Sequence, residues 1–401
     1  MRELEGIEKT AQPLIDGLSM PQSQQGIEQI SQENLVVGTL FHCLCEACPI
    51  KDHQKHTVYF SLISRSSDTL QTQLAIRSRV KKDKCLIWLQ AVWEKLYEES
   101  EPTGPDTIKR KRPFSDETLP EPKRFRVSNN NYSDRHNVFE MPIAPKHVTT
   151  HIQMCPEHLS QHGEPNLLAM QIVAMSTVRH RIYFLPADKR PVNERSPFTL
   201  ADLLDNHDNT QIVKMCTHHG NAFLWRVHVA RLIAEAVLRY DCPESTCRWG
   251  KDDVIFYTSR APNGNLEPYL KIDIERYAHG VSSVDGTLGN SEKKWKLLLL
   301  NVAFLLLQLG VFQRLQEYTR PDVGEWHRTH ILQLIDEKDV GKFGDYFEIV
   351  RHCARLDPIM EGNVVSQDFR NHYYQQIVFP LQEMERRLVW IVGRRNVRRN
   401  T

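Results

Sequence analysis

One apolar segment constrains the fold of this chain more than any other. It reads K-K-W-K-L-L-L-L-N-V-A-F-L-L-L-Q-L-G-V-F from Lys293 to Phe312. Its apolar core is shorter than the roughly 20 residues that cross a bilayer, and Asn301 and Gln308 interrupt it. A helix that is apolar on all sides needs protein on all sides. The segment therefore predicts the buried central helix of a sizeable domain, not a membrane span.

Three further segments with helical periodicity provide neighbours for that helix. Apolar residues recur about every three to four positions in the segments 223–238, 343–356 and 366–390. Pro380 lies inside the last of these, and its ring and missing N–H predict a break or a kink. The first segment is apolar except for one polar stripe, which consists of Arg226, His228, Arg231, Glu235 and Arg239.

Length and composition limit the classes of protein to consider. The chain has 401 residues, of which 40% are hydrophobic and 25% charged, with a net charge of +1. It is long enough to bury a real core, and its near-neutral charge speaks against a dedicated nucleic-acid surface. The N-terminus has no apolar secretory core, and the nine cysteines form no disulfide framework. We therefore expect an intracellular protein, in the cytoplasm or the nucleus, that is not secreted.

Composition also divides the chain into segments. Strands are expected at 57–64 and 180–186, a strand or helix at 85–96, a helix at 165–175, and a short helix at 198–204 capped by Ser196 or Thr199. The predicted divisions are a flexible N-terminal segment at 1–33, a strand-containing part at 34–98, a disordered basic linker at 99–144, a completion of the N-terminal part at 145–222, a helical part at 223–392 and a frayed basic tail at 393–401.

The order of elements from residue 223 onward resembles the C-terminal lobe of a protein kinase. In kinases, the loop after the first of these helices carries H-R-D and a later asparagine, and D-F-G follows. Those side chains accept the substrate proton and hold magnesium. Here the loop offers Lys251, Asp252 and Asp253, and no D-F-G, A-P-E or glycine-rich phosphate loop is found. The predicted fold is α+β and pseudokinase-like, with no catalytic or cofactor-binding residue assigned.

A more specific resemblance rests on six separated pieces of the chain, which are Cys43 to His56, Lys123 to Arg126, Trp249 to Tyr257, Leu306 to Phe312, Tyr346 to Pro358 and Phe379 to Glu383. In these pieces and their order the chain resembles the fungal DUF7580 family, a domain of unknown function associated with prion-inhibition domains. The resemblance implies a degenerate kinase-like domain and, by analogy with similar fungal families, an accessory role in a secondary-metabolite gene cluster. This chain has little of the N-terminal helical region that relatives often carry.

A dense group of cysteines and histidines suits a metal site. The pattern C-x-C-x2-C followed by H-x2-H supplies the soft and imidazole donors that zinc prefers. The alternative is that the cysteines pack in the core, as free cysteines often do, with the histidines in solvent. Zinc is the one cofactor considered, and its candidate ligands are Cys43, Cys45, Cys48, His53 and His56.

Two basic clusters in the predicted linker suit a bipartite nuclear import signal. They are separated by ten residues and lie in a segment expected to be extended. A solvated charge run, or a strand start that packs Phe125 and Val127, is the alternative. Direct nucleic-acid binding is not expected, because no DNA-binding motif accompanies the clusters. The predicted contacts to an import receptor are Lys109, Arg110, Lys111, Arg112, Lys123, Arg124 and Arg126.

The charged loop Lys251, Asp252 and Asp253 has two interpretations. It is either a relic nucleotide or phosphate site in a degenerate cleft, or a turn that these charges cap or solvate while Trp249 anchors it in the core. The structural interpretation is favoured.

The sequence thus predicts a non-enzymatic intracellular interaction or regulatory protein whose partners are proteins of unknown identity. The alternatives are an atypical nucleotide-binding phosphotransferase that uses Asp252 or Asp253 for magnesium, and a nuclear gene-regulatory factor.

Overall fold

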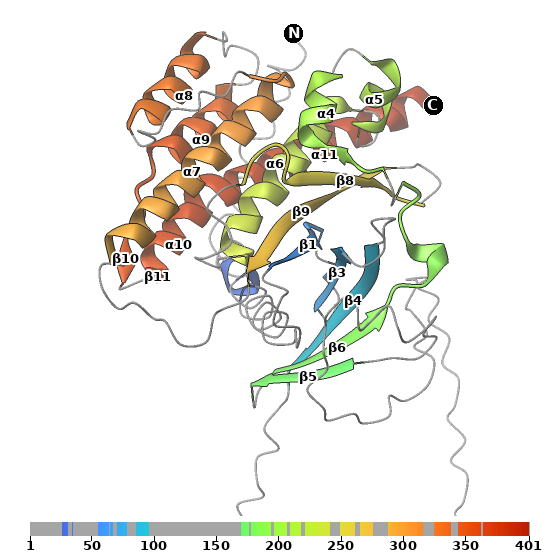
Figure 1. Cartoon of the computed structure of the whole chain (residues 1–401). Helices are drawn as coiled ribbons and strands as arrows, with labels where there is room; N and C mark the ends of the chain where they lie inside the picture. The colour runs from blue at the N-terminus through green and yellow to red at the C-terminus, as the bar shows by residue number, and fades with distance from the viewer. Residues whose placement is uncertain are drawn as a thin grey trace, which may run out of the picture.

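The protein is a mixed α/β structure in which an antiparallel sheet packs against several helices (Figure 1). Figure 1 shows the helices gathered beside strands β8 and β9, whereas strands β5 and β6 lie at the far end of the sheet. The computed structural model describes residues 26–30, 34, 55–63, 65–66, 70–77, 86–95, 170–175, 178–193, 196–206, 209–217, 221–240, 249–260, 265–275, 288–315, 325–337, 344–361 and 364–400.

Nine strands of the described residues form one sheet, with the order β5-β6-β4-β3-β1-β9-β8-β7 and β2 paired with β3. All of their pairings are antiparallel. The sheet joins strands from the predicted N-terminal, middle and helical parts of the chain. The strands are β1 (Lys55–Ser61), β2 (Arg65–Ser66), β3 (Leu70–Arg77), β4 (Leu86–Lys95), β5 (Met170–Met175), β6 (Val178–Phe184), β7 (Phe198–Thr199), β8 (Val254–Thr258) and β9 (Leu266–Glu275).

The two faces of this sheet bury different side chains, because successive residues of a strand point to opposite faces. On β1, Val58 and Phe60 join the main core with the helices, whereas Tyr59 joins a second cluster on the opposite face. β8 repeats the pattern, with Phe256 in the main core and Tyr257 in the second cluster. The strand predicted at 57–64 is therefore confirmed as β1, Lys55–Ser61.

The helices follow the apolar periodicity of the sequence. Thr199 caps α4 through a capping box with Asp202, as predicted. Asn221 caps α6, because its side chain accepts a hydrogen bond from the Leu224 N–H (3.0 Å). The helices are α4 (Leu200–Asp205), α5 (Thr210–Met215), α6 (Ala222–Arg239), α7 (Leu288–Val311), α8 (Glu325–Glu337), α9 (Gly344–Arg355), α10 (Gln367–Tyr373) and α11 (Phe379–Asn400), with a single 3-10 turn at Ala187–Lys189 and a small hairpin of β10 (Met360–Glu361) and β11 (Val364–Val365).

The predicted central helix is α7, and its burial is confirmed. It packs against α6, α8 and α9. The segment Ser291–Val311 has the length and mean hydropathy of a membrane-spanning helix, yet 72% of its apolar 18-residue window is buried inside the protein. Even Gln308 is fully buried, and its Oε1 accepts a hydrogen bond from the Leu315 N–H (3.2 Å).

The C-terminus of α7 is held by its own closing turn and by contacts from α6. Phe312 adopts a positive φ of 50°, and the Gln313 N–H donates to the Gln308 carbonyl (3.3 Å), which closes the helix end. Arg226 of α6 donates to the Gly310 carbonyl (3.0 Å), with its guanidinium over the Phe312 ring (5.5 Å to the centroid). A cation at this position also complements the negative end of the helix dipole.

Pro380 interrupts the α-helical pattern without breaking the helix. The predicted break or kink is replaced by one π-helical turn, Tyr374–Val378, between α10 and α11. In this turn the Phe379 N–H donates to the Tyr374 carbonyl, five residues back. A proline cannot donate the hydrogen bond that an α-helix requires, so a wider turn next to it keeps the chain helical.

Two sequence predictions were wrong where the structure describes them. The 1–33 segment is described only at 26–30, where it is helical and Ile30 is buried. The 165–175 segment, predicted as a helix, contains strand β5, because short apolar runs do not distinguish the two structures. The tail predicted to fray at residue 393 continues as helix α11 to Asn400.

Substitution of Gly310 by alanine tests the packing of α7 against α9. The new Cβ would lie 2.6 Å from Cε1 of Tyr346, whose ring is held by a hydrogen bond to the Leu306 carbonyl (2.7 Å). We expect the free energy of unfolding to fall by about 1–3 kcal/mol, measured by chemical denaturation.

The matched control is Gly393→Ala, because a Cβ at this helical position meets no atom within 4 Å. There we expect no loss, or a gain of up to about 1 kcal/mol from helix propensity. Equal losses in the two variants would contradict close packing at Gly310.

Candidate functional site

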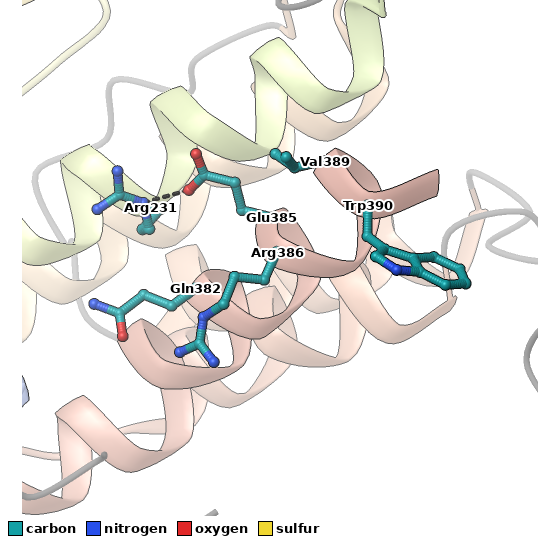
Figure 2. A pocket seen from close by; sticks show the side chains of 6 residues that line it. All are labelled: Arg231, Gln382, Glu385, Arg386, Val389 and Trp390. Carbon is teal, nitrogen blue, oxygen red and sulfur yellow. Dashed lines mark hydrogen bonds and ion pairs between the residues drawn. The ribbon is translucent and has the colours of Figure 1, made fainter. Parts of the chain in front are cut away.

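The candidate site lies between α6 and α11, where the polar stripe of α6 meets polar residues of α11. His228 Nδ1 donates to Glu385 Oε1 (2.7 Å), and Arg231 pairs with Glu385 Oε2. Since an ionised carboxylate can only accept, the proton of His228 lies on Nδ1. Figure 2 shows Arg231 on α6 pointing at Glu385 on α11.

Glu235 is the buried centre of this polar network. Its side chain is 4% exposed, and its oxygens pair with Arg231 (2.5 Å) and Arg239 (3.3 Å). Gln382 Nε2 of α11 also donates to it (2.9 Å). Burial alone would raise the pKa of Glu235, but the two arginines and Gln382 lower it below its ordinary value. The carboxylate is therefore charged and fully engaged.

The network also ties α6 to the N-terminal part of the chain. Arg239 Nη1 donates to the Leu62 carbonyl just after β1 (2.9 Å), and the Tyr240 hydroxyl donates to the Ser61 carbonyl (2.8 Å). Asn34 Nδ2 donates to the Leu238 carbonyl (2.8 Å). This carbonyl lies in the last turn of α6, where carbonyls have no partner within the helix. The position of α11 is thus coupled to the sheet through α6.

An open pocket of about 510 Å³ lies on the outer side of this network. Its polar side includes Arg231 and Gln382, which already bind Glu235, and its outer side has exposed apolar side chains. Val389 is 39% exposed and Trp390 is 44% exposed. Figure 2 shows the Trp390 ring extending away from α6, and the lining residues are Arg231, Gln382, Glu385, Arg386, Val389 and Trp390.

The charged loop predicted from the sequence lies away from this pocket and forms the turn before β8. Trp249 is buried, as is Lys251, whereas Asp252 is exposed. Asp253 closes the turn, because its Oδ2 accepts the Gly250 N–H (3.0 Å) and its Oδ1 faces Lys271 Nζ (3.4 Å). Burial raises the pKa of Asp253 above its ordinary value, although Gly250 and Lys271 oppose this.

Next to that loop, aromatic rings fill the face of the sheet opposite the helices. Trp88 stands edge-on to Tyr257 (4.9 Å between centroids) and to Tyr269 (5.7 Å), and Tyr257 stands edge-on to Tyr269 (5.0 Å). All three are almost fully buried, and the Tyr269 hydroxyl donates to Gln73 Oε1 (3.0 Å). The space between β4, β8 and β9 is therefore occupied by side chains of the protein itself.

The remaining predicted sites fall largely outside the described residues. Cys43, Cys45, Cys48 and His53 do, and only the backbone of His56 is described, in β1. Both basic clusters, 109–112 and 123–126, also lie outside, so zinc binding and nuclear import stay predictions. Within the described ranges, no group of three or more His, Cys, Asp or Glu side chains is placed to hold a metal.

The α6 half of the candidate site was predicted from the sequence, as a polar stripe with no partner assigned. The α11 half, with Gln382, Glu385 and Trp390, was not predicted. A signal was present, because polar residues follow Pro380 on a helix with an otherwise apolar side. Helical periodicity states which residues share a face, but it does not state which helix covers that face.

Ionisation of Glu385 makes the stability of the folded protein depend on pH in the acid range. Burial alone would raise its pKa, but the hydrogen bond from His228 and the charge of Arg231 lower it from 4.5 to about 2. Because the folded-state pKa is depressed, this contribution to stability is present above about pH 5 and is lost as pH falls toward 2. The two pKa values differ by an amount worth about 3 kcal/mol, so Glu385→Gln should flatten the acid limb of the stability curve by up to this amount.

The measurement is chemical denaturation at a series of pH values for wild type and variant. Glu348→Gln is the control, because Glu348 is an exposed carboxylate of α9 that pairs only with Arg351 among the interactions described for it. An unchanged acid limb in Glu385→Gln would contradict the proposed role of its ion pairs.

Comparison of the chain with protein-family models, with curated proteins and with solved structures gives no match in any of the three. The resemblances to the DUF7580 family and to the kinase C-terminal lobe therefore stay predictions.

Proposed function

We propose that this protein is a non-enzymatic intracellular interaction module on a degenerate kinase-like scaffold, which presents the α6–α11 surface to a protein partner. The observation that carries the proposal is the pair of exposed apolar side chains, Val389 and Trp390, at the edge of an open pocket. Large aromatic side chains on a surface are typical anchors of protein interfaces.

The order of elements supports the kinase-like part of the proposal. Helix α6 is followed by a charged turn, the strand pair β8 and β9, the buried helix α7 and then α8 to α11. This is the succession that the resemblance to a kinase C-terminal lobe implies. A scaffold of this kind keeps its ability to position surfaces when its reactive side chains are replaced.

Two features support a non-enzymatic role. Both carboxylate oxygens of Asp253 are engaged, one by the turn and one by Lys271, so this side chain serves the local structure. The aromatic cluster around Trp88 and Tyr257 fills the adjacent space between strands. A nucleotide would have to displace packed rings there, at a cost of lost contacts and buried apolar area.

Affinity capture from the native cell tests the interaction function. We expect wild-type protein to retain partners that Trp390→Ala loses, as quantified by mass spectrometry, because truncation of an interface anchor typically costs about 2 kcal/mol or more. The control is Ile359→Ala, which removes an exposed apolar side chain (59% exposed) outside α11. A set of captured proteins that is the same for all three forms would contradict the proposed surface.

Thermal denaturation with ATP and magnesium tests the enzymatic alternative. We expect no change in melting temperature, because Asp253 is engaged and Trp88, Tyr257 and Tyr269 fill the neighbouring space. A ligand at 100 times its Kd would stabilise the folded state by about 2.7 kcal/mol. A rise in melting temperature that Asp252→Asn abolishes would instead support an atypical phosphotransferase.

A further inference from the structure

We propose that the partner segment bound at the α6–α11 surface is an acidic peptide segment that carries an apolar anchor residue. The inference rests on the proposed interaction function and names the chemistry of the partner. It follows from three features of the surface, namely its satisfied polar groups, its apolar edge and its local charge.

The polar groups beside the pocket are already engaged, so a small anion gains little there. Arg231 pairs with both Glu235 and Glu385, and Gln382 Nε2 donates to Glu235. The Oε1 of Gln382 accepts a hydrogen bond from the Tyr374 hydroxyl (3.1 Å). An anion placed among these groups would have to compete with buried carboxylates for the same donors. Binding energy at this surface therefore has to come from its edge.

That edge is apolar and aromatic. Val389 and Trp390 are exposed next to the pocket, and the guanidinium of Arg394 lies 3.9 Å from the centroid of the Trp390 ring. A guanidinium in this position holds an exposed ring in one orientation, which lowers the entropy cost of using it for binding. The pocket volume of about 510 Å³ is large enough for a bulky apolar side chain packed against this ring.

The helix that carries this edge, α11, has an excess of positive charge that the chain as a whole does not have. Helix α11 contains six arginines and two glutamates in its sequence, whereas the whole chain has a net charge of only +1. The two glutamates are paired within the protein, Glu385 with Arg231 and Glu383 with Arg386 (2.5 Å). Arg386, Arg387 and Arg394 have exposed side chains on the described part of this helix. Charge complementarity favours an acidic partner.

A peptide fits these features better than a lipid surface. The polar side chains and the apolar edge border a concave pocket, which accepts one projecting side chain with charged neighbours on either side. A bilayer surface is broad and would leave the concave part unfilled. The acidic residues of the segment would lie near the exposed Arg387 and Arg394, because Arg386 already pairs with Glu383, and its apolar anchor would lie on Trp390.

Selection from a phage-displayed library of random peptides, on the full-length protein, tests this inference without assuming a sequence. Peptides that bind Trp390→Ala equally well are removed by counter-selection. We expect the remaining peptides to be net negative and to contain an aromatic or large aliphatic residue. If the selected peptides are net positive or uncharged, or if no peptide depends on Trp390, the proposal of an acidic partner is overturned.

A charge exchange with the selected peptide, measured by fluorescence anisotropy, gives the second test. We expect the variant Arg387→Glu/Arg394→Glu to weaken binding by roughly tenfold or more and to gain binding of the same peptide with lysines in place of its acidic residues. Lys214→Glu is the control, because Lys214 is exposed on α5. Because each substituted side chain is exposed, we expect every variant to have the melting temperature of the wild type, which would show that it is folded.

A third experiment measures binding of the protein to phosphatidylserine vesicles. Trp390-dependent binding to vesicles without any selected peptide would assign the surface to anionic lipid and overturn the inference. Trp390-dependent peptides that are not acidic would overturn it as well, but they would leave the proposed interaction function standing.

Discussion

The buried carboxylate of Glu235 is the constraint on which the arrangement of helices depends. A charged oxygen inside a protein costs several kcal/mol unless cations and hydrogen-bond donors surround it. Arg231 and Arg239 come from the same helix, but Gln382 comes from α11, so the carboxylate sets how α11 lies against α6. Because Arg239 also donates to the Leu62 carbonyl, the same network places α6 relative to the sheet.

The two sides of α6 therefore serve different purposes. Its apolar side contacts α7 and the sheet within one continuous core, and its polar side binds α11. Since the polar groups between α6 and α11 satisfy one another, the outer edge of α11 is left with its apolar and basic side chains in solvent. The π-helical turn before Pro380 contributes to this arrangement, because it places the Tyr374 hydroxyl within hydrogen-bond distance of Gln382. Internal stability and an available surface thus arise from the same contacts.

Several parts of the fold could be predicted because their signals are local. The apolar run from Lys293 to Phe312 predicted a buried helix, and Ser196 or Thr199 was predicted to cap a short helix that Thr199 does cap. Strand β5 (Met170–Met175), inside the predicted helix 165–175, was missed because a short apolar run has no periodicity that separates strand from helix. The candidate site was half predicted. The stripe of α6 is visible in the sequence, but Glu385 becomes its partner only through a contact 154 residues away from Arg231.

The amino-acid sequence by itself determined that this chain has a buried helix apolar on all sides, a polar stripe on a second helix and strands with alternating faces. These properties depend on residue type and short-range spacing, which set local conformation and the face that is buried. Only the tertiary structure decided that one sheet joins strands from distant parts of the chain, and that α11 meets the stripe of α6 with Trp390 left exposed. Those outcomes depend on long-range packing and on mutual desolvation of charges, which residue spacing along the chain does not specify.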